Sequence, residues 1–273
     1  MKIENRKSRI EKKHCKGIKF YAQKANSDNM KKENFIYGIR PVIEALKSGK
    51  EIEKILIQKG LRGEGFQQLH TLMREMEIPI QFVPLEKLDR MTRQNHQGVV
   101  AMVSEITYQK IEAILPYVYE QGKVPLILLL DHITDVRNLG AIARTAECSG
   151  VDAILIPEKG SAQMNQDAIK TSAGALYKIP VCRYSSIKET ITLLKNSGLK
   201  IIAATEKANA DYTDVDMKEP LALILGSEES GVSPELLQSA HELVQIPIMG
   251  EIQSLNVSVA AGVILYEILR QRK

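Results

Sequence analysis

Three segments of the chain combine glycine, polar and charged residues at spacings that could position a substrate. The first, residues 135–146, reads Asp-Val-Arg-Asn-Leu-Gly-Ala-Ile-Ala-Arg-Thr-Ala and follows an apolar run that ends at Asp131. We expect Asn138 to cap a helix, Gly140 to permit close approach of backbone or ligand, and Arg144 to lie one turn above Gly140. A guanidinium there could bind a phosphate with its planar fork of donors, although a single helical arginine is more often a solvated surface charge.

The second segment, residues 225–234, reads Leu-Gly-Ser-Glu-Glu-Ser-Gly-Val-Ser-Pro. A predicted strand enters a glycine loop, and Ser233-Pro234 then begins a helix with proline in its favoured place. Gly226 and Gly231 have phosphate-loop spacing, but no lysine follows and two carboxylates stand between them, so we reject a P-loop. A carboxylate such as Glu228 suits the hydroxyls and amines of a nucleoside or a methionine. An ordinary strand–turn–helix connection would give the same pattern.

The third segment, residues 246–260, reads Ile-Pro-Ile-Met-Gly-Glu-Ile-Gln-Ser-Leu-Asn-Val-Ser-Val-Ala. A predicted strand gives way to a loop, and Ser254 or Asn256 is expected to begin the closing helix. The first turn of a helix offers free backbone N–H groups and a polar lining that suit a binding site. Plain N-capping explains the same two residues equally well.

The chain lacks the motifs of several classes of enzyme. No Gly-x-Gly-x-x-Gly follows a strand, and the chain has no Gly-x-Ser-x-Gly, no His-Glu-x-x-His and no kinase set. Cys15, Cys148 and Cys182 are scattered and lack metal-ligand spacing, so we expect reduced thiols and no metal. Because no apolar run is long enough to span a bilayer and no signal core is present, we expect a cytoplasmic protein without a membrane segment.

Residues 1–33 hold the excess positive charge of the chain. This segment contains eleven lysines and arginines against four acidic residues, whereas the whole chain carries a net charge of +4. Counterion release attracts such a basic arm to a polyanion without sequence specificity. A solvated, disordered leader is the alternative reading, and the sequence leaves both open.

The remaining sequence divides into two α/β units joined by a linker. Residues 34–105 are expected to form a small domain, residues 106–123 a partly helical linker that Pro116 breaks or kinks, and residues 124–273 a larger domain. The apolar runs of the larger unit are short and continuous, as in parallel strands buried on both faces. They lie at residues 126–130, 153–156, 178–181, 200–204, 221–225 and 243–246. A closing helix from about residue 256 to 270 is apolar on most faces, so it must be buried in the core or against a second subunit.

Taken together, the three segments closely resemble the three motifs of the SpoU (TrmH) family of RNA ribose methyltransferases, part of the SPOUT superfamily. Asn-Leu-Gly-Ala-Ile-x-Arg-Thr-Ala matches at residues 138–146, Gly-x-Glu-x-x-Gly at 226–231 and Ser-Leu-Asn-Val-Ser-Val-Ala at 254–260. The front unit resembles the substrate-binding domain of the family through residues 38–46 and 96–101. Within the family, the resemblance is greatest to 23S ribosomal RNA guanosine-2′-O-methyltransferases. It covers roughly residues 34–272.

The resemblance implies an α/β fold in which the C-terminal parallel sheet contains a deep trefoil knot, preceded by a small N-terminal α/β substrate-binding domain. It implies a homodimer and a metal-free transfer of methyl from S-adenosylmethionine to a ribose 2′-hydroxyl. One departure concerns the turn before the first motif helix, where many relatives have proline and this chain has Val136. The cofactor-binding residues implied by the resemblance are Thr205, Gly226, Ile246, Ser254 and Leu255.

For catalysis the resemblance nominates Arg144, with Asn138 and Asn256 orienting the ribose and Glu228 organising the pocket and Arg144. A free guanidinium is a poor general base, so we expect Arg144 to bind the RNA phosphate and to stabilise the developing alkoxide. The group that takes the hydroxyl proton is left open.

The front unit is expected to hold RNA by its shape and by single-stranded or bulged bases. Its predicted phosphate contacts are Lys59, Arg62, Arg90 and Arg93, which could equally be solvated surface charges. Four phenylalanines and no tryptophan provide few stacking platforms, which argues against a generic single-strand binder. Three alternatives remain: a transfer RNA 2′-O-methyltransferase, a non-catalytic RNA-binding module of the same fold, and a nucleotide-dependent oxidoreductase disfavoured by the missing glycine fingerprint.

Overall fold

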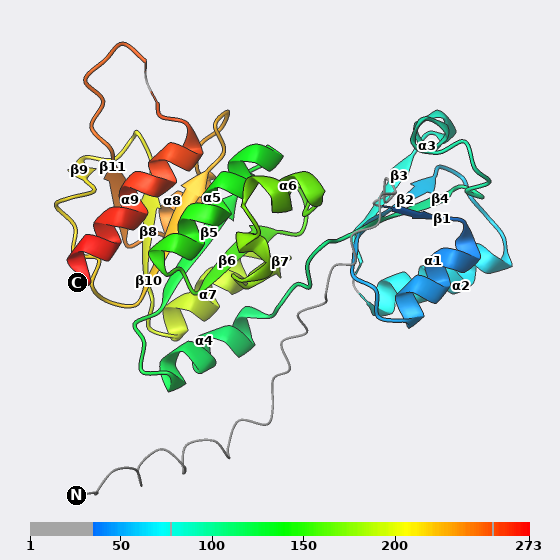
Figure 1. The fold of residues 1–273 in the computed structure, drawn as a ribbon, viewed down its shortest axis with the longest axis horizontal. Coiled ribbons are helices and arrows are strands. Elements are labelled where there is room, and N and C mark those ends of the chain that lie inside the picture. Colours follow the sequence, from blue (N-terminus) through cyan, green and yellow to red (C-terminus); the bar gives the residue numbers. More distant parts are fainter. Residues whose placement is uncertain (1–34, 77, 253) are drawn as a thin grey trace, which may run out of the picture. The chain divides into compact units, whose positions relative to one another are not determined.

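A computed structural model describes residues 35–76, 78–252 and 254–273 of the protein. The described residues form two β-sheets, each with its own helices (Figure 1). The basic arm predicted for residues 1–33 lies outside the described residues. None of the described helices has the length and apolar character needed to cross a membrane.

The smaller sheet has four strands in the order β1-β4-β2-β3. Strand β4 runs antiparallel to β1 and β2, whereas β2 and β3 are parallel. Apolar side chains of helices α1 and α2 pack on one face of this sheet, where Leu46 and Leu69 join Ile55 and Ile57 in a buried cluster. The elements are β1 (Phe35–Tyr37), α1 (Ile39–Lys47), β2 (Ile52–Gln58), α2 (Glu64–Glu75), β3 (Ile80–Val83), α3 (Leu85–Met91) and β4 (Val99–Val103).

The larger sheet has seven strands in the order β7-β6-β5-β10-β8-β11-β9, and every neighbouring pair is parallel. This confirms the parallel sheet that the continuous apolar runs predicted. Its strands are β5 (Leu126–Asp131), β6 (Ala153–Pro157), β7 (Val181–Tyr184), β8 (Lys200–Ala204), β9 (Ala210–Asp211), β10 (Leu221–Gly226) and β11 (Glu242–Gln245).

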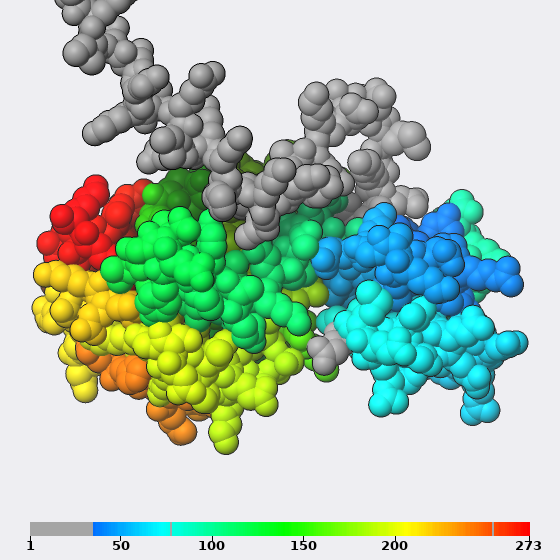
Figure 2. Space-filling view, turned by 90° about the horizontal axis from the view of Figure 1, so that it is seen from below, coloured from blue at the N-terminus to red at the C-terminus, as the bar shows by residue number. Residues whose placement is uncertain are grey.

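Helices cover both faces of the larger sheet because successive side chains of each strand point to opposite sides. In β5, Leu128 packs with helices α5 (Val136–Ser149), α6 (Gln166–Thr171) and α9 (Val257–Gln271). The next residue, Leu129, packs on the other face. The helices there are α4 (Ile111–Glu120), α7 (Ile187–Asn196) and α8 (Pro234–Ser239). Figure 2 shows the surface over α4 and α7, drawn in green and yellow-green.

Three details differ from the sequence-based expectations. Strand β7 begins at Val181 rather than at residue 178, because residues Ala175–Tyr177 form a 3₁₀-helix first. The short strands β1 and β9 were not predicted, since two or three residues carry too little periodic signal. Pro116 lies inside α4 without ending it.

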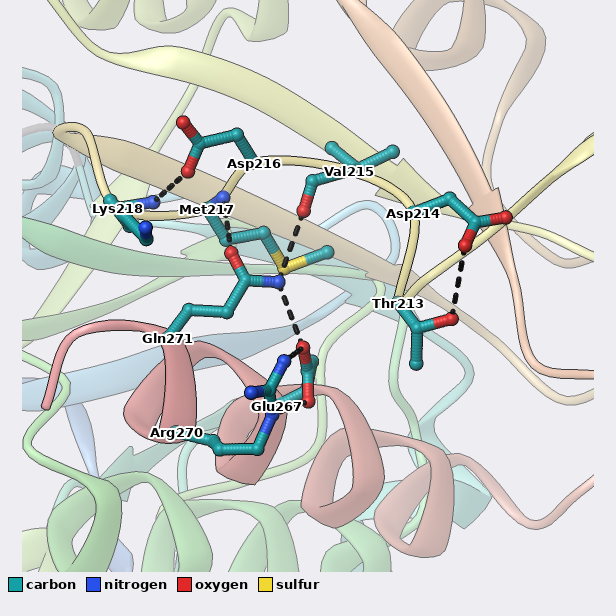
Figure 3. Close-up of polar contacts among 9 residues, drawn as sticks. All are labelled: Thr213, Asp214, Val215, Asp216, Met217, Lys218, Glu267, Arg270 and Gln271. Atoms are coloured by element: carbon teal, nitrogen blue, oxygen red, sulfur yellow. Dashed lines mark hydrogen bonds and ion pairs between the residues drawn. The ribbon is translucent and has the colours of Figure 1, made fainter.

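The carboxyl end of α9 is fastened to the segment that precedes β10, as Figure 3 shows. The Gln271 side chain donates to the carbonyl oxygen of Val215 (3.1 Å) and accepts from the backbone N–H of Met217 (2.8 Å). Hydrogen bonds from Arg270 and Gln271 hold the pKa of the buried Glu267 carboxyl at about 2. The last turn of the closing helix is therefore fixed to the rest of the domain by polar side chains as well as by its apolar face.

Gly140 lies where α5 and α6 pack against each other. A Cβ at this position would lie 2.6 Å from the Cβ of Thr171 and 3.0 Å from the carbonyl oxygen of Ala168. The expectation that Gly140 permits close approach is confirmed, and the approaching group is the neighbouring helix. No side chain fits here unless α6 moves.

We predict that Gly140→Ala lowers the free energy of unfolding by about 1–3 kcal/mol, because the added methyl forces α5 and α6 apart. Alanine has the higher helix propensity, which would by itself give the opposite sign. Urea unfolding measures the change. Gly250→Ala serves as the matched control, since no atom lies within 4 Å of the added Cβ. Equal or greater stability of Gly140→Ala would contradict the close packing.

Candidate active site

The carboxyl ends of the parallel strands meet at one edge of the larger sheet. Asp131, the last residue of β5, is the register partner of Gly226, the last residue of β10. Helices α5 and α8 begin in the segments that leave β5 and β10. Because ligands of open parallel sheets bind outside the carboxyl ends of the strands, this edge is where a site is expected.

Asp135 caps the amino end of α5. One of its carboxylate oxygens accepts from the backbone N–H groups of Arg137 and Asn138, each at 2.8 Å. The prediction that Asn138 caps this helix is therefore wrong, because the carboxylate three residues earlier takes that role. The helix begins at Val136, three residues before the predicted start, and valine occupies this position without disturbing the cap. The Asn138 side chain is left available for other contacts.

The three motifs meet at the side-chain amide of Asn256. Its Nδ2 donates to Oδ1 of Asn138 at 3.0 Å and to Oε1 of Glu228. Its Oδ1 accepts from the backbone N–H of Ser258 at 3.0 Å, which confirms that Asn256 begins the closing helix. We call Asn138, Glu228 and Asn256 the polar cluster. Asn256 and Glu228 are exposed and Asn138 is half-buried, so a ligand can reach the cluster from solvent.

The loop that presents Glu228 requires glycine at both ends. A Cβ on Gly226 would lie 2.1 Å from the carbonyl carbon of Gly231, so no side chain fits. Gly231 has a φ of 66°, in the left-handed region that favours glycine. Ser227 and Gly231 exchange two backbone hydrogen bonds, of 3.2 and 2.9 Å, which close the loop. The two glycines therefore set the loop shape, and the carboxylate at its tip contacts Asn256.

Arg144 is exposed on α5. Within the described part of the chain its guanidinium forms no ion pair, and the Glu228 carboxylate contacts Asn256. The expected link between Glu228 and Arg144 is thus not among the contacts seen, and the catalytic role of Arg144 stays a prediction. A guanidinium held on a rigid helix and open to solvent is available to a phosphate.

The predicted cofactor-binding residues follow three neighbouring strands. Thr205 comes directly after β8, Gly226 ends β10, and Ile246 comes directly after β11. Thr205 is buried, and its backbone N–H donates to the carbonyl of Val244 at 2.9 Å. Ser254 and Leu255 lie immediately before α9 and are both exposed.

Sequence reasoning missed the role of Asp131 in organising this edge. Its carboxyl group is buried at the end of an apolar strand, and Oδ2 accepts from the backbone N–H of Ser233 at 2.7 Å. This bond ties β5 to the start of α8. An acidic residue that ends a fully apolar strand was the available signal, since a buried carboxylate needs partners.

The predicted RNA contacts all belong to the four-stranded-sheet unit. They are Lys59, Arg62, Arg90 and Arg93, and all are exposed. Lys59 and Arg62 follow β2, whereas Arg90 lies on α3 and Arg93 just after it. Their contact with RNA stays a prediction. Among the residues that the structure describes, no group of three His, Cys, Asp or Glu side chains could hold a metal ion.

Comparison with known proteins places this arrangement in a family. Residues 125–266 match the model of the SpoU rRNA Methylase family, which covers the larger sheet and the polar cluster. The chain belongs to this family. Residues 35–109 match the model described as RNA 2′-O ribose methyltransferase substrate binding. The protein is therefore an RNA methyltransferase of the SpoU type, as the motif resemblance predicted.

Relatives match over most of this SpoU protein. A TrmH-family tRNA/rRNA methyltransferase homologue from Staphylococcus saprophyticus is 36% identical over 240 residues, covering 88% of this chain and 96% of the relative. A homologue from Bacillus subtilis is 35% identical with the same coverage. The AdoMet-bound rRNA methyltransferase of Sinorhizobium meliloti has a TM-score of 0.56 and 26% identity, covering 86% of each chain. The TrmH/SpoU tRNA modifying enzyme of A. aeolicus has a TM-score of 0.51 and 32% identity, covering 59% of this chain and 83% of that one.

The two roles of Asn256 can be separated by substitution. We predict that Asn256→Ala lowers the free energy of unfolding by about 1 kcal/mol through loss of the helix cap, whereas Asn256→Ser retains most of it. Both variants lose the contacts to Asn138 and Glu228, so methyl transfer should fall on the order of 100-fold in both. Urea unfolding and a methylation assay measure the two effects. A fully active Asn256→Ser protein would show that the polar cluster has no part in catalysis.

Proposed function

We propose that this protein transfers a methyl group from S-adenosylmethionine to a ribose 2′-hydroxyl, and that its substrate is a guanosine of 23S ribosomal RNA. The observation that carries the proposal is the polar cluster, in which Asn256 joins residues of all three motifs at the carboxyl edge of a parallel sheet. Both family models support RNA as the substrate class. The choice of 23S rRNA and guanosine rests on the motif resemblance.

The residues around the edge fit S-adenosylmethionine. Thr205, Gly226 and Ile246 follow adjacent strands, so their backbone groups can line one pocket for the adenosyl moiety. The segment before α9 exposes apolar side chains beside this edge, with Leu255 39% and Met249 97% exposed. Such side chains suit the faces of an adenine ring, and Ser254 can add a polar contact. The bound cofactor would supply an electrophilic methyl group on a positively charged sulfur.

The residues of the chain would orient the acceptor and neutralise its charge. Asn138 and Asn256 offer amide groups that can hold the ribose hydroxyls, and Glu228 fixes the Asn256 amide. Arg144 would bind the RNA phosphate and stabilise the negative charge that develops on the 2′-oxygen. Correct orientation of two reactants can by itself supply much of the rate enhancement, and no metal is needed in any of these roles.

Further parts of the proposal concern assembly and location. Residues 34–105 would bind RNA through Lys59, Arg62, Arg90 and Arg93, and the methyltransferase domain would occupy residues 124–273. Helix α9 exposes Val259 and Tyr266, which a second subunit would cover in a homodimer. We also propose that the methyltransferase domain contains a trefoil knot. The protein would act in the cytoplasm, with the basic arm adding nonspecific attraction to RNA.

Nucleoside mass spectrometry tests the reaction and the substrate. Unmodified 23S rRNA and bulk transfer RNA are each incubated with the protein and S-adenosylmethionine. New 2′-O-methylguanosine in 23S rRNA alone supports the proposal. Methylation of transfer RNA alone would show that transfer RNA, and not 23S rRNA, is the substrate. Methylation of neither RNA, by a protein that binds the cofactor, contradicts the proposal.

We predict that Arg144→Ala lowers the methylation rate on the order of 100-fold or more, because an unbalanced charge on the 2′-oxygen is costly in the transition state. The affinity for S-adenosylmethionine should change less than about twofold, as calorimetry would show, because the guanidinium contacts the RNA and not the cofactor. Arg137→Ala is the matched control, an arginine on the first turn of the same helix. Equal losses of methylation rate and cofactor affinity in Arg144→Ala would contradict a role for Arg144 in stabilising the charge on the 2′-oxygen.

A further inference from the structure

A histidine–aspartate pair at the end of β5 lies outside the three motifs. The Nδ1 atom of His132 is 2.6 Å from Oδ1 of Asp131. The Asp131 side chain is 1% exposed, whereas that of His132 is 55% exposed. The carboxylate is thus inside the protein and the imidazole projects from it towards solvent.

The imidazole is held in one orientation. In a neutral ring, Nδ1 carries the proton and donates to the Asp131 carboxylate, which leaves Nε2 as an acceptor. Gly160 closes one side of the ring, because a Cβ there would lie 2.6 Å from Cδ2 of His132. Within the described residues no hydrogen bond reaches Nε2. The atom that can accept a proton is therefore the one left open to a ligand.

The backbone at His132 turns through a positive φ. The angle is 57°, in the left-handed region that residues other than glycine, asparagine, aspartate and histidine rarely adopt. Residues other than glycine in this region gather at functional sites. The turn lies between the buried side chain of Asp131 and the exposed imidazole of His132.

The pair shares an edge with the polar cluster. Asp131 is the register partner of Gly226, and its Oδ2 accepts from the N–H of Ser233 at 2.7 Å. One carboxylate therefore holds both the imidazole and the end of the loop that presents Glu228. On the other side, His132 precedes α5, whose first turn carries Asn138.

We propose that His132 is the catalytic residue that accepts the proton of the ribose 2′-hydroxyl, an inference that rests on the proposed function. The O–H bond breaks and its proton moves to Nε2 of His132. The freed electron pair on oxygen forms the new bond to the methyl carbon, and the electrons of the sulfur–methyl bond stay on sulfur, which becomes neutral. Asp131 stabilises the imidazolium, as a carboxylate behind an imidazole does in other general-base sites.

The other residues assigned to the candidate site do not suit the role of proton acceptor. A guanidinium such as Arg144 is a poor base, and the Glu228 carboxylate contacts Asn256. Histidine commonly exchanges a proton near neutral pH. The segments around the ring also carry Asp135 on its own loop and, beside Gly160, Glu158 and Lys159. With Asp131, these segments carry three carboxylates and one ammonium group.

His132→Asn tests the role in the full-length protein, using whichever RNA the wild-type protein methylates. Asparagine tolerates the left-handed backbone but cannot take up a proton. We expect the single-turnover rate to fall about 100-fold or more, with RNA affinity changed less than about twofold. The wild-type rate should fall as pH drops below neutral, and the residual rate of the variant should lack that decline. The matched control is His241→Asn. His241 lies at the opposite edge of the sheet, where the strands begin, and its Nδ1 accepts from the backbone N–H of Ile201.

Chemical rescue and modification separate catalysis from a structural role. Glycine suits the backbone at this position, so His132→Gly should fold, and added imidazole should restore part of its rate with the same pH dependence. Diethyl pyrocarbonate should modify His132 in the wild-type protein, and unmodified RNA should protect it. His241 should remain reactive in the presence of RNA.

The outcomes are distinguishable. A wild-type protein that methylates neither RNA overturns the proposed function and this role with it. If the wild-type protein is active and His132→Asn is equally fast, only the role of His132 is overturned. A variant that loses RNA affinity but keeps its single-turnover rate and pH dependence would make His132 an RNA contact instead, which also overturns the proposal.

Discussion

The side-chain amide of Asn256 links three segments that are far apart in the chain. Its nitrogen donates to Asn138 and Glu228, and its oxygen caps the helix that it begins. An amide has both donors and an acceptor, so one side chain can satisfy all three contacts. A carboxylate could cap the helix but could not donate to Glu228. The arrangement of the site depends on this residue being an asparagine at the first position before α9.

That link exists because the larger sheet is parallel. Parallel strands bring the segments after β5, β10 and β11 to one edge, although about a hundred residues separate the first from the second in the sequence. Glycine then allows two close approaches. Gly140 admits α6 against α5, and Gly226 admits the backbone of its own loop. Each polar group of the site therefore lies on an element whose position is fixed by packing.

Asp131 makes a second set of polar contacts at the same edge of the sheet as Asn256. A carboxylate buried at the end of an apolar strand is unfavourable unless it is hydrogen-bonded, and both of its oxygens have partners. One oxygen holds the loop that precedes α8 and the other holds His132. The desolvated charge thus fixes two loops at the edge where the RNA ribose is expected to bind. A neutral apolar residue at this position would fill the space without positioning either loop.

The sequence by itself determined the family, the parallel sheet and most element bounds, because its apolar runs and three motifs are local patterns. Strand β8 matches the predicted range, residues 200–204, to the residue. Only the tertiary structure decided that Asp135 rather than Asn138 caps α5, since both types are good caps and the choice depends on where the chain leaves β5. The Asp131–His132 pair likewise depended on burial and a backbone angle, which no spacing in the sequence encodes.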